Sequence, residues 1–237
     1  DADAGIRANT AWDVANGSGI IVAVLDTGYV THSDLAANIV AGYDFISNTT
    51  TAGDGNGRDS NPADPGDYYG GNPSSWHGTH VAGTVAAVTN NAKGVAGTAW
   101  GAKVMPVRVL GRGGGSTSDI ADAIIWASGG TVSGVPTLSA ANAADVINMS
   151  LGGSGSCDSL TQNAINSAVS RGTTVVVAAG NSNANVANFS PASCNNVVAV
   201  ASVTSSSSRS SFSNYGSLID VSAPGSNILS TLNSGST

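Results

Sequence analysis

The 237-residue sequence predicts an α/β domain built on a doubly wound, mostly parallel sheet with helices on both faces. Apolar segments of strand length alternate with segments of helical periodicity, which is the order of a parallel sheet with crossover helices. The run at residues 20–26 is apolar at every position before its last, as expected for a strand covered on both faces. Hydrophobic residues form 41% of the chain and we find no internal repeat, so residues 1–237 are interpreted as one domain.

The amino-terminal third contains one short helix, one strand and a long loop. The helix is predicted at residues 6–14 and ends near Asn16-Gly17, and the strand follows at residues 20–26. Residues 48–75 have neither a helical nor a strand period and are rich in aspartate. We interpret them as an acidic loop insertion.

A helix rich in small residues is predicted at residues 77–88. Gly78 and Gly83 lie inside it, and each weakens a helix by roughly 1 kcal/mol relative to alanine. We therefore expect neighbouring backbone to approach this helix closely. Such an approach would fix the direction of His77, which lies in the first turn.

The rest of the chain continues the alternation of strands and helices. A strand at residues 102–110 contains Pro106, which is expected to interrupt it. Ser118 is the predicted N-cap of the next helix, and Gly172 is the predicted end of the helix after that. The remaining elements are helices at residues 119–128 and 159–170, strands at residues 144–149, 173–179, 197–203 and 218–221, and a polar loop at residues 129–143.

The composition bears on partners and on the compartment. A net charge of −7 argues against a nucleic-acid partner, and no apolar run approaches the ~20 residues that span a membrane. Few lysines, abundant Ser, Gly and Asn, and an even cysteine count suggest an exported protein. Cys157 and Cys194 lie in loops expected on the same side of the sheet. They can form a disulfide in an oxidising compartment or stay free thiols in a reducing one.

Polar residues stand where predicted strands end. Asp26 closes the strand at 20–26, Ser150 follows the strand at 144–149, and Asn181 comes just after the strand at 173–179. In doubly wound sheets, sites lie at the carboxyl ends of strands. Each residue also has a structural interpretation, because Asp26 and Asn181 suit turns and a histidine at a helix start is usually structural. Their joint placement favours a functional site.

Five ordered motifs, spanning nearly the whole chain, resemble those of the subtilisin-like serine proteases, or subtilases. The order of the aspartate before the histidine on an α/β sheet is that of the family. The resemblance implies a secreted endopeptidase that hydrolyses polypeptides. The motifs are Val24-Leu25-Asp26-Thr27-Gly28, His77-Gly78-Thr79-His80-Val81-Ala82-Gly83, Ser150-Leu151-Gly152-Gly153, Ala179-Gly180-Asn181 and Ser222-Ala223-Pro224-Gly225.

The resemblance assigns three catalytic roles. Asp26 resembles the carboxylate that orients the catalytic imidazole and stabilises its protonated form. His77 resembles the general base that deprotonates a nucleophilic serine and later protonates the leaving amine. Asn181 resembles the side-chain donor to the oxyanion of the tetrahedral intermediate.

The family also implies a substrate groove. An extended peptide would pair with two edge segments, Gly113-Gly114-Gly115 and Ser150-Leu151-Gly152, largely through main-chain hydrogen bonds. Ala178, Ala179, Gly180 and Gly152 would wall the pocket for the residue before the cut. Because these walls are small, we expect a large apolar side chain to fit there. The alternative for the glycine loop is a flexible connector.

Calcium is the implied cofactor, at two places. Four aspartates of the acidic loop, Asp54, Asp59, Asp64 and Asp67, repel one another unless a cation neutralises them, and carboxylate oxygens suit Ca²⁺. The alternative is a solvated acidic loop. A second, family-like site would use Asp34 and Asn91 with backbone oxygens of the Thr89–Val95 loop, where Lys93 adds an opposing positive charge.

The family's nucleophile lies in a Gly-Thr-Ser-Met-Ala motif, which does not occur in these 237 residues. Gly235-Ser236-Thr237 imitates it, but Ser236 follows Gly225 too closely and no helix follows. We therefore expect the serine on a missing carboxyl-terminal segment that binds this larger fragment. One alternative is a catalytically inactive subtilase-like module that binds peptides. Another is a small-molecule-binding protein, which the lack of Gly-x-Gly-x-x-Gly after a strand disfavours.

Overall fold

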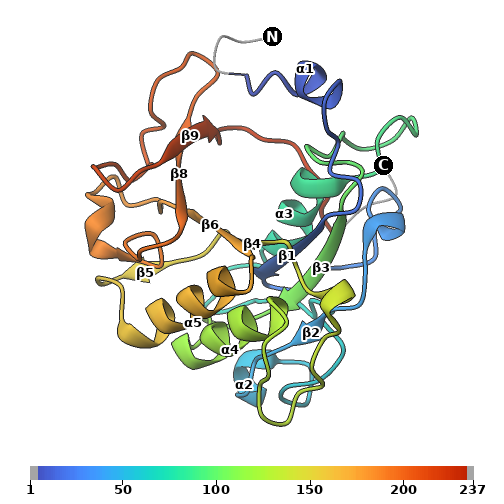
Figure 1. Cartoon of the computed structure of the whole chain (residues 1–237), viewed down its shortest axis with the longest axis vertical. Helices are drawn as coiled ribbons and strands as arrows, with labels where there is room; N and C mark the ends of the chain where they lie inside the picture. The colour runs from blue at the N-terminus through green and yellow to red at the C-terminus, as the bar shows by residue number, and fades with distance from the viewer. Residues whose placement is uncertain (1–4, 234–237) are drawn as a thin grey trace.

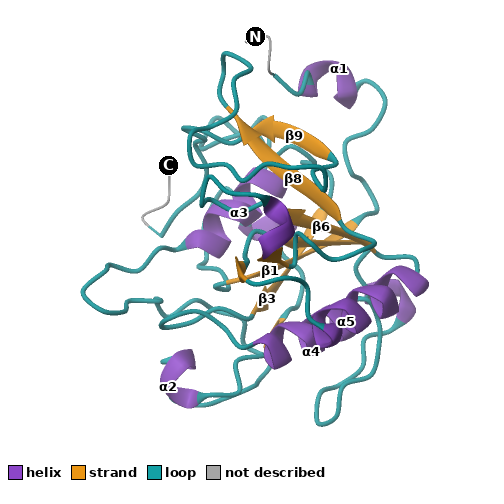
Figure 2. Ribbon diagram, turned by 90° about the vertical axis from the view of Figure 1, so that its left-hand side faces the viewer, coloured by secondary structure: helices purple, strands orange, loops and turns teal. Residues whose placement is uncertain are grey.

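In the computed structural model, which describes residues 5–233, a seven-stranded sheet runs through the middle of the molecule (Figures 1 and 2). Its strand order is β2-β3-β1-β4-β6-β8-β9, and every pairing within it is parallel. Among these residues, no helix has the length and apolar composition that crossing a bilayer requires. In chain order the elements are α1 (Ala8–Trp12), β1 (Ile21–Asp26), η1 (Ala36–Asn38), β2 (Tyr43–Asp44), α2 (Thr49–Ala52), α3 (His77–Ala86), β3 (Lys103–Arg108), α4 (Thr117–Ala127), η2 (Ala140–Asn142), β4 (Val146–Met149), β5 (Gly153–Ser154), α5 (Ser159–Ser170), β6 (Thr174–Ala178), η3 (Val186–Asn188), β7 (Phe189–Ser190), β8 (Val198–Val203) and β9 (Val221–Pro224).

Helices cover both faces of the sheet, which confirms the predicted fold class. The helices α4 and α5 lie side by side on one face and α3 lies on the other, as Figure 2 shows. Alternate residues of β1 feed the two cores. Ala23 and Leu25 join the cluster under α4 and α5, whereas Val22 and Val24 pack with the small residues of α3. The unbroken apolar run of β1 therefore reflects burial on both sides.

Two glycines let α3 pack as closely as its sequence predicts. A Cβ atom on Gly78 would lie 2.1 Å from the carbonyl oxygen of Gly28, in the turn after β1. A Cβ atom on Gly83 would lie 2.1 Å from the hydroxyl oxygen of Thr231. The lost helix propensity is thus offset by contacts that no other residue permits, and the start of α3 is held against the end of β1.

Pro106 does not interrupt its strand, contrary to the sequence prediction. The backbone N–H groups of the odd-numbered residues Lys103 and Val109 donate to carbonyls on the β1 side. Because successive residues of a strand point their N–H groups to opposite sides, the nitrogen of Pro106, which carries no hydrogen, faces β2. There β2 pairs only with Val107 and Arg108. The proline therefore costs β3 no ladder hydrogen bond.

Three element boundaries also differ from the sequence predictions. The 48–75 segment contains the one-turn helix α2, because the Asn48 side chain accepts from two backbone N–H groups and Gly53 ends the turn at φ 72°. The N-cap of α4 is Ser116, whose hydroxyl accepts from the N–H of Asp119, and not Ser118. The last strand is β9, later than the predicted 218–221. A separate antiparallel pair, β5 and β7, was not predicted.

Candidate active site

The carboxylate of Asp26 and the imidazole of His77 form the centre of the site. Asp26 ends β1 and His77 begins α3, and Nδ1 of His77 lies 2.8 and 2.9 Å from the two carboxylate oxygens. Asp26 is fully buried and also accepts from the N–H of Thr27 at 2.8 Å. The His77 side chain is 44% exposed. Among the described residues only Nδ1 of the ring is engaged, so Nε2 remains available for chemistry.

The charge distribution around His77 favours its protonated form. The hydrogen bond with Asp26 raises the pKa of His77 above its ordinary value, against the opposing effect of burial. The negative charges of Asp26 and Asp67 act in the same direction as the hydrogen bond. A base with this environment can take up a proton and hold it while a second step proceeds.

A pocket of about 400 Å³ opens beside the predicted oxyanion donor. It is walled mostly by small residues from the ends of two adjacent strands, β4 and β6, and by Phe189 and Ser190 of β7. Ser150, Leu151 and the exposed Asn181 also line this pocket. The four residues that the sequence analysis predicted for its walls all line it, namely Gly152, Ala178, Ala179 and Gly180.

Asn214, which the sequence analysis missed, holds the turn that carries Asn181. Its side-chain nitrogen donates to the carbonyl of Ala179 at 2.8 Å, and its side-chain oxygen accepts from the N–H groups of Ser182 and Ala184 at 3.0 and 3.1 Å. It is fully buried. No local pattern marks it, because it lies in a serine-rich loop far along the chain.

The two predicted edge segments face each other across a neighbouring groove. Gly113, Gly114 and Gly115 line one side of a cavity of about 530 Å³, and Leu151 and Gly152 line the other. A third cavity, of about 380 Å³, is lined by Gly113 and Gly114 together with Tyr69 and His77. Sequence segments far apart in the chain thus line one continuous region beside the Asp26–His77 pair.

Comparison with known proteins decides the family. The model of the subtilase family matches residues 17–237. The chain belongs to the subtilase family. It is 68% identical to an extracellular protease of Xanthomonas campestris pv. campestris, over 99% of this chain and 42% of the relative. It is 49% identical to an extracellular basic protease of Dichelobacter nodosus, over 98% of this chain and 40% of the relative.

A solved structure agrees with the sequence relatives. A protease from Pseudoalteromonas arctica superposes with a TM-score of 0.90 at 66% identity, covering 94% of this chain and 68% of that one. The structural likeness confirms the subtilisin-like α/β fold. The chain spans about two fifths of the length of the two sequence relatives.

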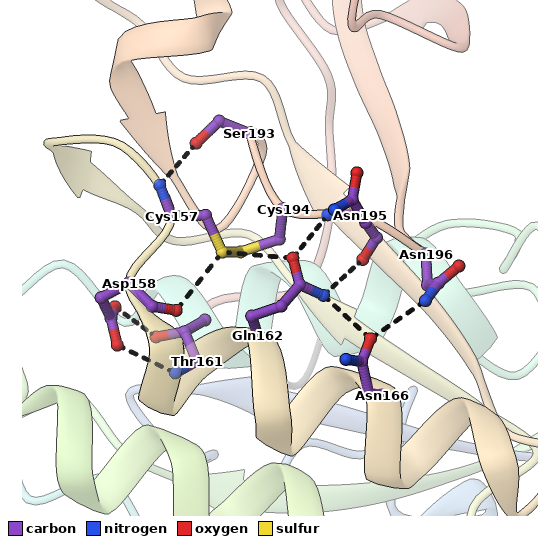
Figure 3. The surroundings of a disulfide bond; sticks show 9 residues. All are labelled: Cys157, Asp158, Thr161, Gln162, Asn166, Ser193, Cys194, Asn195 and Asn196. Carbon is purple, nitrogen blue, oxygen red and sulfur yellow. Dashed lines mark hydrogen bonds between the residues drawn. A yellow bond between two sulfur atoms is a disulfide. The ribbon is translucent and has the colours of Figure 1, made fainter.

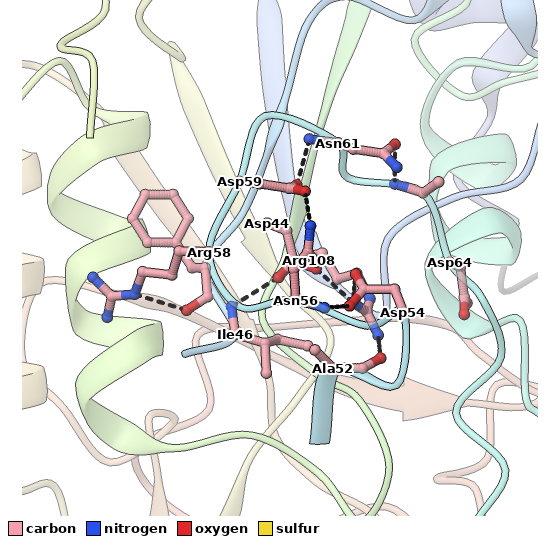
Figure 4. A network of polar contacts seen from close by, with 12 residues as sticks. Asp44, Ile46, Ala52, Asp54, Asn56, Arg58, Asp59, Asn61, Asp64 and Arg108 are labelled. Carbon is pink, nitrogen blue, oxygen red and sulfur yellow. Dashed lines mark hydrogen bonds and ion pairs between the residues drawn. The ribbon is translucent and has the colours of Figure 1, made fainter. Parts of the chain in front are cut away.

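In this subtilase the aspartates of the acidic loop do not act as one cluster (Figure 4). Asp54 accepts from the backbone N–H of Asn56, and Asp59 accepts from the side-chain nitrogen of Asn56 at 2.7 Å, so Asn56 links these two carboxylates. Asp64 instead accepts from the hydroxyl of Thr27, and Asp67 holds Ser75 at the entry to α3. Within residues 5–233 no three His, Cys, Asp or Glu side chains group as a metal site.

The second predicted metal site centres on a fully buried carboxylate. Asp34 accepts from the side-chain nitrogen of Asn91 at 2.6 Å and from the N–H of Val95 at 2.9 Å. In the same loop, the Thr89 hydroxyl donates to the carbonyl of Ala87 and the backbone N–H of Lys93 donates to the side-chain oxygen of Asn91. Hydrogen-bond donors thus already occupy both oxygens of this carboxylate.

A buried arginine, which the sequence analysis did not single out, lies under the acidic loop (Figure 4). Arg108 ends β3, is fully buried, and pairs with the carboxylates of Asp44 and Asp54 and the carbonyl of Ala52. Its Nε atom has no partner among the described residues. Burial raises the pKa of Asp44 to about 6, although the nearby Arg108 charge opposes that shift.

Cys157 and Cys194 form a disulfide, one of the two states that the sequence left open, and the bridge joins the two segments that border the pockets (Figure 3). Cys157 follows the β5 segment and Cys194 follows β7, with their Cα atoms 5.0 Å apart. Around it, the N–H of Cys157 donates to Ser193, and Gln162 of α5 exchanges two hydrogen bonds with the backbone of Asn195.

Proposed function

We propose that this chain is the larger part of a subtilisin-like serine endopeptidase that hydrolyses peptide bonds with Asp26 and His77. The observation that carries the proposal is the Nδ1 contact of His77 with buried Asp26, which leaves Nε2 beside the grooves. Asp26 selects the tautomer with a proton on Nδ1 and stabilises the imidazolium that forms. No other pair of titratable side chains among the described residues combines such contact with access to a groove.

The reaction would run through a serine supplied by a segment beyond residue 237. Nε2 of neutral His77 takes the serine proton as the serine oxygen attacks the substrate carbonyl. Asn181 donates to the oxyanion of the tetrahedral intermediate. Nε2 then gives its proton to the leaving amine as the C–N bond breaks, and the acyl group stays on the serine oxygen. Water, deprotonated by Nε2, attacks this ester in the same way, which releases the carboxylic acid and returns the proton to the serine. Residues 234–237, including the rejected Ser236, lie outside the described part of the structure.

The proposed substrates are extended polypeptides with a large apolar residue before the cut. The glycine loop 113–115 and the 150–152 segment offer backbone groups on opposite sides of a groove, which suits main-chain pairing. The pocket of about 400 Å³ has no charged residue in its lining, so an apolar side chain fits its chemistry.

Calcium remains a proposal for two places. Asp54 and Asp59 supply carboxylate oxygens on either side of Asn56 at one place, and Asp34 supplies a buried carboxylate at the other. A bound ion would neutralise the excess negative charge of the loop. Chelation is then expected to lower the melting temperature by mass action, and the variant Asp54→Asn to reduce that response. An unchanged melting temperature with chelator would count against both sites.

The relatives' names and the disulfide support secretion as the compartment. The proposed partner is the carboxyl-terminal segment with the nucleophile, either continuous with this chain or bound to it after cleavage. An inactive peptide-binding module is the competing proposal. The deciding experiment is hydrolysis of a chromogenic peptide by protein that extends beyond residue 237, with His77→Ala as the variant. Peptide binding without hydrolysis in the unaltered protein would favour the inactive module.

A further inference from the structure

A chain of three hydrogen bonds runs from the acidic loop to the first turn of α3. The N–H of Gly78 donates to the hydroxyl oxygen of Thr27 at 3.0 Å, and that hydroxyl donates to Oδ2 of Asp64 at 2.7 Å. The other carboxylate oxygen of Asp64 accepts from the N–H of Gly66 at 2.8 Å. Gly78 directly follows His77 and Thr27 directly follows Asp26, so this chain ties together the backbone beneath both residues of the pair.

Asp64 is built into this position and is not a mobile surface acid. It is 6% exposed, and Thr27 is 3% exposed. Its own N–H donates to the carbonyl of Tyr29, whose N–H donates to the carbonyl of Pro62. The loop therefore lies along the turn after β1, and a Cβ atom on Gly28 would meet the Pro62 oxygen at 2.4 Å.

We propose that Asp64 is a positioning residue for the Asp26–His77 pair and acts through the Thr27 hydroxyl. Asp64 takes the only hydroxyl proton of Thr27, which leaves an oxygen lone pair to receive the Gly78 N–H and fixes the threonine rotamer. The same threonine directs its own N–H to Asp26. Thr27 thus sets the spacing between the end of β1 and the start of α3, and so the contact that Asp26 makes with His77.

The role is transmitted by hydrogen bonds and not by charge. The charges that raise the pKa of His77 are those of Asp26 and Asp67. An uncharged residue that can accept from Thr27 should therefore serve at position 64. A purely structural role for Asp64 would lower stability and leave the pKa of His77 unchanged.

The test measures the pKa of His77 by NMR titration of its imidazole in the 237-residue chain, where it needs no hydrolysis. Thr27→Val removes both side-chain hydrogen bonds and keeps the shape, and we expect it to lower the pKa of His77 by roughly 1 as the Asp26 contact loosens. Thr27→Ser keeps both side-chain hydrogen bonds and should retain the original value. Asp64→Asn keeps one acceptor oxygen for the Thr27 hydroxyl and gives up the bond from the Gly66 N–H, so it should also stay close to that value. Asp64→Ala, which removes the acceptor for Thr27, should follow Thr27→Val.

Thr173→Val is the matched control, because Thr173 is also buried and its hydroxyl bonds one backbone carbonyl far from the site. It should lower the melting temperature without moving the pKa of His77. An unchanged pKa in folded Thr27→Val, or equal losses in Asp64→Asn and Asp64→Ala, would overturn the proposal.

For catalysis the inference rests on the proposed function, and that part is tested separately in protein that hydrolyses peptides. There Thr27→Val should lower kcat on the order of tenfold to a hundredfold with little change in KM, as expected for misplaced reacting groups. If the unaltered protein hydrolyses nothing, the proposed function fails while the NMR result still decides the positioning role. An unchanged kcat in an active protein would overturn the catalytic part alone.

Discussion

The Nδ1 atom of His77 lies within 2.9 Å of both carboxylate oxygens of Asp26, although 51 residues separate them in the sequence. The contact exists because β1 ends and α3 begins at the same edge of the sheet, where Gly78 packs on Gly28. The carboxylate is buried and the imidazole is half-exposed, so the pair joins the protein interior to the grooves.

The rate of peptide hydrolysis should fall on the acid side with a single ionisation, and the midpoint of this fall should lie above the ordinary histidine pKa of ~6.5. Asp26 raises the pKa of His77, and only neutral His77 can act as base. The same shift stabilises the fold below the unfolded pKa of His77, and this contribution is lost as the pH rises through the folded pKa. Activity and this stability contribution therefore change in opposite directions. Full kcat/KM at pH 5 would contradict the role of His77.

Replacement of Asn181 should slow turnover and leave binding nearly intact. In the proposed mechanism its amide donates to the oxyanion, which forms only after attack, so Asn181→Ala would remove a stabilisation of the transition state. A loss of about 10²–10³ in kcat is expected, the magnitude known for the corresponding asparagine of a family member. Steady-state kinetics measure it. A rise in KM with constant kcat would assign Asn181 to substrate binding instead.

Loss of the disulfide should destabilise the native state. The bridge closes a sequence separation of 37 residues, which is worth about 4 kcal/mol in the chain-entropy model. In denaturant unfolding, the free energy of unfolding of the double variant Cys157→Ser, Cys194→Ser is expected to be lower by about this amount. Reduction of the unaltered protein should act similarly. Two free thiols on alkylation of the unfolded, unreduced protein would contradict the bridge itself.

Removal of the buried arginine should be costly at neutral pH and less costly in acid. Arg108→Met leaves the Asp44 carboxylate buried without its cation, a loss of about 3–5 kcal/mol. Burial already raises the pKa of Asp44 to about 6, so protonation below that pH relieves the unpaired charge. The double variant Asp44→Leu, Arg108→Met should recover much of the loss in urea unfolding. Equal losses at pH 5 and pH 7.5 would contradict this explanation.

The sequence predicted the elements that periodicity and end signals define. The helix α5 has its predicted bounds, Ser159–Ser170, because an Asp158 cap and a glycine end enclose an amphipathic run. The strand β1 is likewise apolar and ends, as predicted, in the carboxylate of Asp26. The pocket residues around Gly152 and Gly180 came from the family resemblance, and the structure brings them together.

The missed features depend on tertiary contacts. Arg108 lies near the end of an apolar strand, where the sequence alone does not tell a buried arginine from an exposed one, and the acidic loop above it buries it. In the sequence, Asp64 and Asp54 are both aspartates of the same acidic loop and look alike. In the structure, Asp64 accepts a hydrogen bond from Thr27, whereas Asp54 pairs with Arg108. Short elements such as α2 are set by one cap and one left-handed glycine, which periodicity does not detect.

The most direct measurement of the central claim is labelling by a serine-reactive phosphonate, with the labelled residue located by mass spectrometry. In protein that extends beyond residue 237, we predict one labelled serine, outside these 237 residues, and strongly reduced labelling in His77→Ala and Asp26→Asn. In the isolated 237-residue chain, no label is expected. Labelling at Ser236, or labelling that persists unchanged without His77, would contradict the claim that Asp26 and His77 activate a serine supplied by a downstream segment.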